Sequence, residues 1–200
     1  MPLQLDEKQL READIGAFFR PSQLEALDIT YDQLQRLEAD GTVERVARGL
    51  YRLTDAEPTE HYSLAAVCAR VPRSIICLLS ALNVHDIGTQ LPREVWLAIH
   101  HKARPPRVSG TKIRLLRFTG PAWTYGIQDT AFEGVPARIT SPARTVVDCF
   151  RFERLIGREA AMEALGDALR NKKVTTDALL RTLEVLPSRR LRNALETIDL

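Results

Sequence analysis

The sequence predicts an α+β protein in which an N-terminal winged helix-turn-helix is followed by an α+β domain with a small sheet and a helical C-terminal tail. Two short helical patterns with capping signals lie between residues 20 and 40. Two strand-like runs joined by a glycine-containing loop follow within residues 42–53, and the last sixty residues are almost wholly helical in pattern. Helices followed by a hairpin are the order of elements in a winged helix.

The predicted helices of the first domain have recognisable ends. Residues 5–17 carry apolar positions on a rough helical period, which indicates a first helix. A second, short helix is expected to start near Pro21, since proline suits the first helical position. The third starts at Thr30, which has capping-box spacing with Gln33, and ends before Gly41.

A hairpin is expected after the third helix. Residues 42–46 and 50–53 are strand-like, and the loop between them contains Gly49, as a tight hairpin turn requires. A polar, proline-containing stretch at 54–60 then marks a boundary. The sequence therefore predicts two domains, residues 1–56 and residues 57–200.

The outward face of the third helix suits DNA reading. Leu34 and Leu37 point to the core at 100° per residue, so an arginine and two amides lie on or beside the opposite face. Such side chains make bidentate contacts with guanine and adenine in the major groove. The hairpin adds arginines suited to phosphates or to the minor groove. The residues predicted to contact DNA are Thr30, Tyr31, Gln33, Gln35, Arg36, Arg45, Arg48 and Arg52. A protein-interaction role for the winged helix competes with this interpretation, because residues 1–60 hold 7 Lys/Arg against 13 Asp/Glu.

The second domain is expected to combine a small sheet with many helices. Its predicted helices span residues 61–70, 74–84, 142–150, 157–171, 175–186 and 188–198, and its predicted strands span 95–99, 113–118, 126–132 and 135–139. The clearest helix start is Ser141-Pro142, where serine is a cap and proline takes the first helical position.

A run of one charge sign lies in the middle of the chain. Residues 61–140 hold 10 Lys/Arg against 4 Asp/Glu, and no acid occurs between residues 100 and 117. The cations of this basic segment are Lys102, Arg104, Arg107, Lys112, Arg114 and Arg117. They indicate a surface that binds a partner such as phosphates, whereas the simpler interpretation is a solvated loop and edge strand.

The sequence offers no pattern for catalysis, metal or cofactor binding. His100 and His101 are adjacent on a strand and face opposite sides, so they do not readily ligate one ion. Glycine-rich phosphate loops are absent, and no strand carries the carboxylates of a metal-dependent nuclease. Three scattered cysteines, no signal peptide and no apolar run of 18 residues favour a cytoplasmic protein without a membrane partner.

Several ordered motifs together resemble the AbiEi family of antitoxins. They are DITYDQLQRLEADGTVERVARGLYRL at 28–53, PREVWLAI at 92–99 with the basic loop after it, GVPARITSPARTVVDCFR at 134–151, and the helical stretch EALGDALRNKKVTTDALLRTL at 163–183. The resemblance covers about residues 18–198, and Arg45, Arg48 and Arg52 match the family's basic wing pattern.

The resemblance implies an antitoxin of a type IV toxin–antitoxin system. Such a protein represses its own operon by binding inverted repeats in double-stranded DNA. Its C-terminal domain counters a cognate nucleotidyltransferase-like toxin without necessarily forming a stable complex, and the basic segment is then a candidate surface facing that toxin. Three alternatives stay open: a plain transcription factor whose second domain senses a ligand or sets oligomeric state, a nuclease-type enzyme, and RNA binding through the basic segment.

Overall fold

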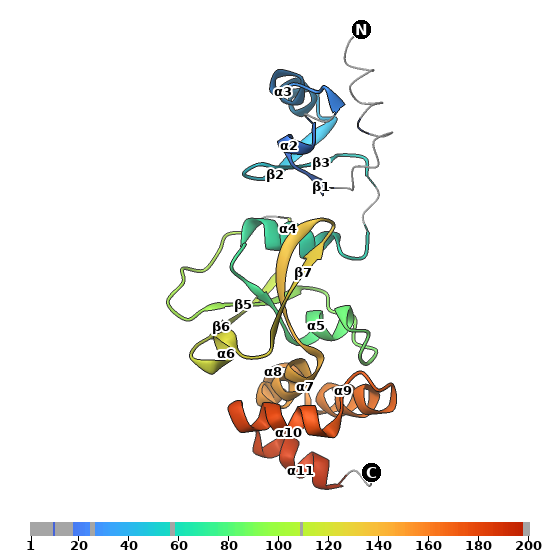
Figure 1. Cartoon of the computed structure of the whole chain (residues 1–200), viewed down its shortest axis with the longest axis vertical. Helices are drawn as coiled ribbons and strands as arrows, with labels where there is room; N and C mark the ends of the chain where they lie inside the picture. The colour runs from blue at the N-terminus through green and yellow to red at the C-terminus, as the bar shows by residue number, and fades with distance from the viewer. Residues whose placement is uncertain (1–9, 11–17, 25–26, 57–58, 109, 198–200) are drawn as a thin grey trace. The chain divides into compact units, whose positions relative to one another are not determined.

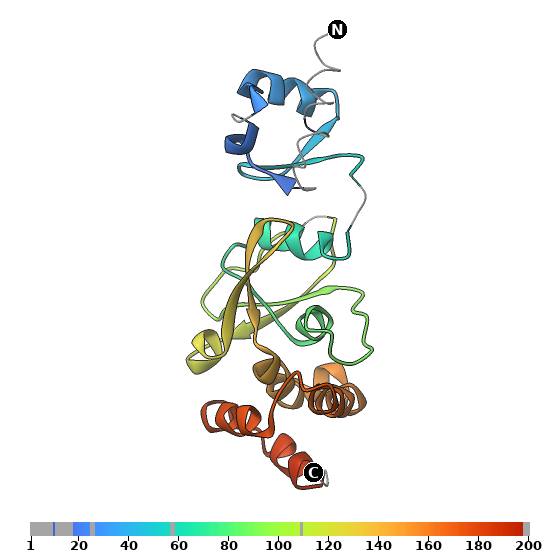
Figure 2. The ribbon, with the colours of Figure 1, turned by 45° about the vertical axis from the view of Figure 1, so that its right-hand side comes forward.

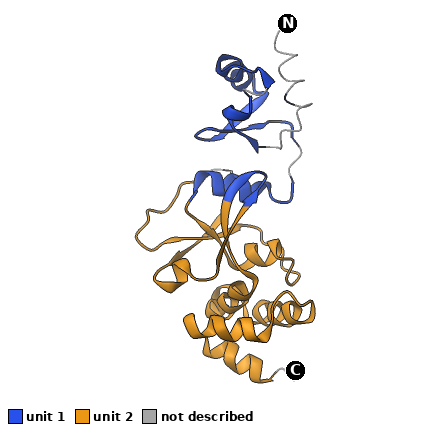
Figure 3. Ribbon diagram, in the orientation of Figure 1, with its two compact units in different colours: residues 1–72, 131–136 blue, residues 73–130, 137–200 orange. Residues whose placement is uncertain are grey.

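The chain folds into two compact units. The computed structural model describes residues 10, 18–24, 27–56, 59–108 and 110–197. The first unit comprises residues 1–72 and 131–136, and the second comprises residues 73–130 and 137–200 (Figures 1 and 3). The mixture of small sheets and helices confirms the predicted α+β class.

A winged helix forms most of the first unit. Its elements are β1 (Phe18–Phe19), α2 (Pro21–Leu24), α3 (Tyr31–Ala39), β2 (Val43–Ala47), β3 (Leu50–Leu53) and α4 (Tyr62–Arg70). The strands form an antiparallel sheet in the order β1-β3-β2, and Gly49 takes a φ of 68° in the turn between β2 and β3. The first predicted helix, residues 5–17, lies outside the described residues apart from Leu10, which is buried.

Apolar side chains from β1, α2, α3, β2 and β3 share one core. Leu34 and Leu37 of α3 are fully buried, as their helical spacing predicts. They belong to the same cluster as Leu10, Phe19, Leu24, Ile29, Val43, Tyr51 and Leu53. This core fixes which face of α3 is left for solvent.

Helix α4 belongs to the first unit, although the predicted boundary after residue 56 assigns it to the second domain. Its Tyr62 ring stacks on Phe18 at a centroid distance of 5.4 Å and its hydroxyl accepts a hydrogen bond from Arg52 Nη1 at 3.1 Å. The helix also contacts β2. The polar stretch at 54–60 is therefore a connection within the first unit.

A mixed five-stranded sheet with the order β6-β5-β4-β8-β7 lies at the centre of the remaining fold. The strands are β4 (Ile75–Ile76), β5 (Val95–His100), β6 (Ile113–Phe118), β7 (Ile127–Phe132) and β8 (Val135–Thr140). Strands β5 and β6 run parallel, and so do β4 and β8, whereas β4 and β5 are antiparallel. The predicted hairpin turns at Glu133 and Gly134, and both residues have positive φ.

The predicted helix at 74–84 is wrong at its beginning. Ile75 and Ile76 form β4, pairing with Ala98 of β5 and Ile139 of β8, and only Leu78–Val84 forms the helix α5. A short, fully apolar run in a central strand has the same pattern as a buried helical turn, so periodicity could not separate them.

Helices cover the sheet and continue to the C-terminal end. They are α6 (Pro121–Thr124), α7 (Pro142–Arg151), α8 (Glu153–Ile156), α9 (Arg158–Arg170), α10 (Thr176–Val185) and α11 (Arg189–Thr197). Figures 1 and 2 both show α9, α10 and α11 gathered beside α7. Ser141 caps α7 by accepting a hydrogen bond from Arg144 N at 3.4 Å, which confirms the predicted start.

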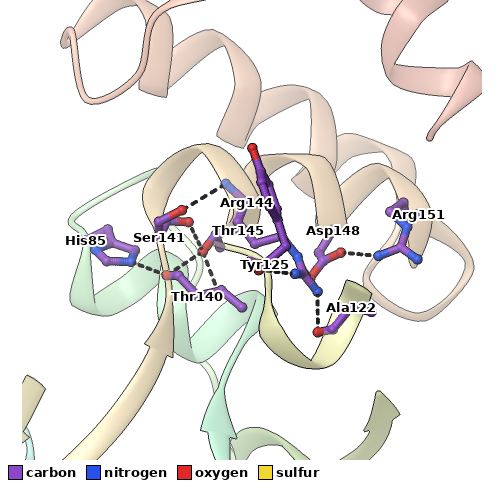
Figure 4. A network of polar contacts seen from close by, with 9 residues as sticks. All are labelled: His85, Ala122, Tyr125, Thr140, Ser141, Arg144, Thr145, Asp148 and Arg151. Carbon is purple, nitrogen blue, oxygen red and sulfur yellow. Dashed lines mark hydrogen bonds and ion pairs between the residues drawn. The ribbon is translucent and has the colours of Figure 1, made fainter. Parts of the chain in front are cut away.

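A buried ion pair in α7 connects this helix to α6 and to the residue that follows it (Figure 4). Arg144 and Asp148 are both fully buried, with 2.7 Å between Nε and Oδ2. Arg144 also donates to the carbonyls of Tyr125 at 2.6 Å and Ala122 at 3.1 Å. Asp148 accepts a second charged hydrogen bond from Arg151 at 2.7 Å. Each buried charge is thus paired and hydrogen-bonded, which is the condition for tolerating it in a core.

Candidate DNA-binding surface

Local hydrogen bonds set the start of α3. Thr30 Oγ1 accepts a hydrogen bond from Gln33 N at 3.3 Å, and Gln33 Oε1 accepts from Thr30 N at 2.7 Å. This is the predicted capping box, and it satisfies backbone donors that a helix end leaves open. A fixed start and two buried leucines leave α3 little freedom to rotate about its axis.

Gln35 and Arg36 lie on the exposed face of α3. Tyr31 and Asp32 are exposed on the same helix, and 57% of Tyr31 is accessible. Within the part of the chain that the structure describes, neither the Gln35 nor the Arg36 side chain has a hydrogen-bond or ion-pair partner. An amide and a guanidinium are therefore presented together, which is the chemistry that reads base edges in the major groove.

Two members of the predicted DNA-contacting set have another role. The side chains of Thr30 and Gln33 bond to each other, because Thr30 Oγ1 also donates to Gln33 Oε1 at 2.7 Å. The sequence pattern places both residues near the outward face, but it does not show that the capping box occupies their oxygens. On α3, Gln35 and Arg36 are therefore the main remaining candidates for contacts with DNA bases.

The wing presents two exposed arginines beside α3. Arg45 on β2 lies opposite Tyr51 on β3, and Arg48 occupies the turn. Burial raises the pKa of Tyr51, while the Arg45 charge opposes this rise. A hydrogen bond between the Tyr51 and Tyr31 side chains also raises it, and the same bond joins the first turn of α3 to the wing.

Arg52 differs from the other two wing arginines. Only 11% of its side chain is exposed, and its Nη1 lies 3.2 Å from Glu44 Oε1. Its Nη2 donates to the Ala56 carbonyl at 2.9 Å, and its guanidinium lies 4.6 Å from the Tyr62 ring centroid. These contacts hold the guanidinium inside the first unit, so Arg52 is not placed as a phosphate contact. Its physical role is to attach α4 to the wing.

Arg20 is a cation near the wing that sequence reasoning missed. It is exposed and precedes α2, and it lines the same hollow of about 240 Å³ as Arg48 and Leu50. In the sequence, Arg20 directly precedes Pro21, and this position indicates only the start of a helix and not a place near the wing. The sheet order β1-β3-β2 was needed to bring the segment near the turn of the wing.

The basic segment of the second unit divides into free and engaged cations. Lys102, Arg104, Arg107 and Lys112 are exposed in the loop between β5 and β6. In contrast, Arg114 Nε lies 2.8 Å from Glu94 Oε1, and Arg117 Nη1 donates to the carbonyls of His101 at 2.7 Å and Ala103 at 2.9 Å. Arg117 therefore supports the loop that carries the other cations.

The described residues contain no group of three or more His, Cys, Asp or Glu side chains arranged to hold a metal ion. Glu94, the acid nearest β5, is paired with Arg114. The three cysteines are free and buried, and burial raises the pKa of Cys68 to about 12. No helix in the described parts of the chain has the length and apolar character needed to cross a membrane.

A capped helix with an exposed amide and guanidinium, set beside a wing with exposed arginines, is the arrangement of a winged helix-turn-helix. Residues 7–54 match the family model described as "Transcriptional regulator, AbiEi antitoxin". The match lies in the N-terminal part of the chain and agrees with the AbiEi resemblance that the sequence motifs carry.

The fold extends beyond the region that the family model covers. The crystal structure of the RV2827C protein from Mycobacterium tuberculosis is similar over 89% of this chain and 69% of that chain, with a TM-score of 0.55 and 14% sequence identity. At this identity the likeness shows the fold alone. No curated protein matches the sequence.

Proposed function

We propose that the chain is an autorepressor that binds inverted repeats in its own operator and is the antitoxin of a type IV toxin–antitoxin system. The observation that carries the DNA-binding half is the exposed pair Gln35 and Arg36 beside the wing arginines Arg45 and Arg48. In this arrangement α3 enters the major groove and reads bases, while the wing contacts the backbone. Inverted repeats require two copies of the domain, with half-sites one helical turn or a multiple of it apart.

The antitoxin half is supported by the match of residues 7–54 to the AbiEi family model and by the exposed cations of the second unit. A nucleotidyltransferase-like toxin is the proposed partner, countered in the cytoplasm without a requirement for a stable complex. The exposed cations Lys102, Arg104, Arg107 and Lys112 are the surface that suits an acidic or nucleotide-bearing partner. A plain regulator without a toxin partner is the outcome if co-expression with a candidate nucleotidyltransferase-like toxin gives no growth rescue.

Arg36 gives the sharpest test of base reading. The variants Arg36→Ala and Arg36→Lys are compared on operator and scrambled duplexes by fluorescence anisotropy. Loss of a bidentate base contact weakens operator binding by roughly 1–3 kcal/mol and leaves binding to scrambled DNA nearly unchanged. The lysine variant keeps the charge but loses the planar fork, so it is expected to behave like alanine on the operator. Equal losses on both duplexes, with recovery by lysine, would instead identify a phosphate contact.

A further inference from the structure

An open cleft lies among the C-terminal helices of the second unit. Two adjoining hollows, of about 520 Å³ and about 240 Å³, share Phe150, Arg190 and Asn193 in their walls. The larger is bounded by the end of α7 and the start of α11, and the smaller also by α9. The larger volume falls within the range of small-molecule sites, roughly 300–1,000 Å³.

The walls of this cleft are cationic. Arg151, Arg189 and Arg190 line the larger hollow, and Arg158 lines the smaller one together with Glu153. The Arg190–Glu153 pair is loose, with 3.9 Å between Nε and Oε2. Across the described ranges, the side chains of Arg158 and Arg189 have neither an ion-pair nor a hydrogen-bond partner. Two of the four arginines that line the cleft, Arg158 and Arg189, therefore have no matching acid among the described residues, and a third, Arg190, is only loosely paired.

Aromatic side chains form part of the lining of this cleft. Phe150 is 2% exposed and borders both hollows, while the partly buried Phe152 lines the larger one. The Arg151 guanidinium lies 5.7 Å from the Phe152 ring centroid and is held by Asp148, and the Phe118 ring stacks on Phe152 at 6.1 Å, so the position of Phe152 is fixed. A site with unpaired guanidinium groups near an aromatic edge suits a ligand that is anionic at one end and flat and apolar at the other.

We propose that this cleft binds a small phosphorylated ligand with a planar ring, of the chemical class of a mononucleotide. The phosphate groups contact Arg158, Arg189 and Arg190, because a guanidinium pairs with phosphate through two parallel hydrogen bonds. The ring packs against the edge of Phe152, because the Arg151 guanidinium and the Phe118 ring already lie against the Phe152 ring. A lone phosphate ion leaves this aromatic edge uncovered, so a ligand that carries a ring binds more tightly. The proposal does not depend on the DNA-binding function.

Calorimetric titration of the full chain with ADP and with inorganic phosphate tests the proposal. The double variant R189Q/R190Q removes two cations of the cleft. R192Q is the matched control, since Arg192 is exposed on the same helix but does not line either hollow. We expect saturable binding of ADP, tighter than that of phosphate, a loss of about tenfold or more in R189Q/R190Q, and no change in R192Q.

Three results would overturn the proposal. They are absence of saturable ADP binding, equal affinity for phosphate and ADP, or an equal loss in R192Q. If R189Q/R190Q does not fold, R158Q on α9 replaces it with the same expectation. Operator DNA affinity is measured in parallel and is expected to stay unchanged in R189Q/R190Q. A joint loss of ADP and DNA binding would assign these arginines to nucleic-acid phosphates and reject a mononucleotide site.

Discussion

At the scale of single residues, Arg144 and Asp148 have the most demanding environment of any ion pair described. Both side chains are fully inaccessible, and Gly126 is packed so closely that a Cβ there would lie 2.9 Å from Arg144 Cβ. Burial of this kind makes the pair costly to break, because the remaining charge has no access to water. The exposed pair Asp177–Arg181 on α10 has the same 2.7 Å separation and the same four-residue spacing, but both of its side chains are solvated.

Asp148→Ala is therefore expected to destabilise the second unit by about 3–5 kcal/mol, because Arg144 is left as an uncompensated buried charge. Asp177→Ala, the matched exposed control, is expected to cost only about 0.5 kcal/mol. Urea unfolding followed by tryptophan fluorescence measures both, since the two tryptophans, Trp96 and Trp123, lie in the second unit. Similar midpoints for the two variants would contradict a special role for the buried pair.

At the scale of elements, the wing combines two kinds of arginine. Arg45→Ala and Arg48→Ala together are expected to weaken binding to every DNA sequence. They are also expected to lower the slope of log K against log salt by about one unit per lost phosphate contact. Arg52→Ala is the contrast: its contacts with Glu44, Ala56 and Tyr62 are internal, so stability falls and the slope stays unchanged. Anisotropy titrations at several salt concentrations separate the loss of DNA contacts from the loss of stability. An unchanged slope in the double variant would show that the wing does not contact the DNA backbone.

The elements that local chemistry specifies could be predicted from the sequence. The capping box at Thr30, the cap at Ser141 and the hairpin turn at Gly134 each depend on residues within a few positions of one another. Contacts between distant segments could not be predicted. Ile76 pairs with Ile139, so the segment expected to begin a helix forms β4 instead. Arg52 donates a hydrogen bond to Tyr62, so its side chain is held inside the first unit and not at the candidate DNA-binding surface. The exposure of Gln35 and Arg36 was predictable because helical period alone sets it.

Hydrogen bonds also attach the loop after α5 to helix α9. Glu163 Oε1 accepts hydrogen bonds from Thr89 Oγ1 at 2.6 Å and Thr89 N at 2.9 Å, and Oε2 accepts from Gln90 at 2.9 Å. The hydrogen bond from the Thr89 side chain, followed by that from Gln90, lowers the pKa of Glu163 below its usual value of 4.5. A folded-state pKa below the unfolded value adds stability above about pH 4.5, and this stability is lost as pH falls through the folded pKa.

Glu163→Gln is expected to be less stable than the parent chain at pH 7, and the difference is expected to shrink as pH falls below about 4.5. Urea midpoints at neutral and acidic pH measure this change. Glu184→Gln on α10 is the control, because Glu184 is exposed and has no hydrogen-bond or ion-pair partner among the described residues. If Glu163→Gln lowers the urea midpoint by the same amount at both pH values, the carboxylate charge does not contribute to stability.

At the scale of the whole molecule, charge is unevenly distributed along the chain. Residues 1–60 are net acidic, with 7 Lys/Arg against 13 Asp/Glu, and residues 61–140 are net basic, with 10 against 4. Helix α3 and the wing, the proposed DNA-binding surface, thus lie in the acidic part, which disfavours tight binding to random DNA. The excess of cations lies elsewhere, mainly in the exposed loop that Arg117 supports.

The exposed basic loop between β5 and β6 has two candidate partners, the toxin and DNA. Charge reversal at Lys102, Arg104 and Arg107 is expected to abolish growth rescue from the toxin and leave operator repression intact, because α3 and the wing form a complete DNA-reading unit without this loop. Reversal of three other exposed cations, Arg170, Lys172 and Arg192, gives the same change in net charge and is expected to preserve both activities. Growth rescue and an operator reporter are measured in the same cells. Loss of repression with rescue intact would assign the loop to DNA phosphates, and retention of both activities would leave it as a solvated loop beside the edge strand β6.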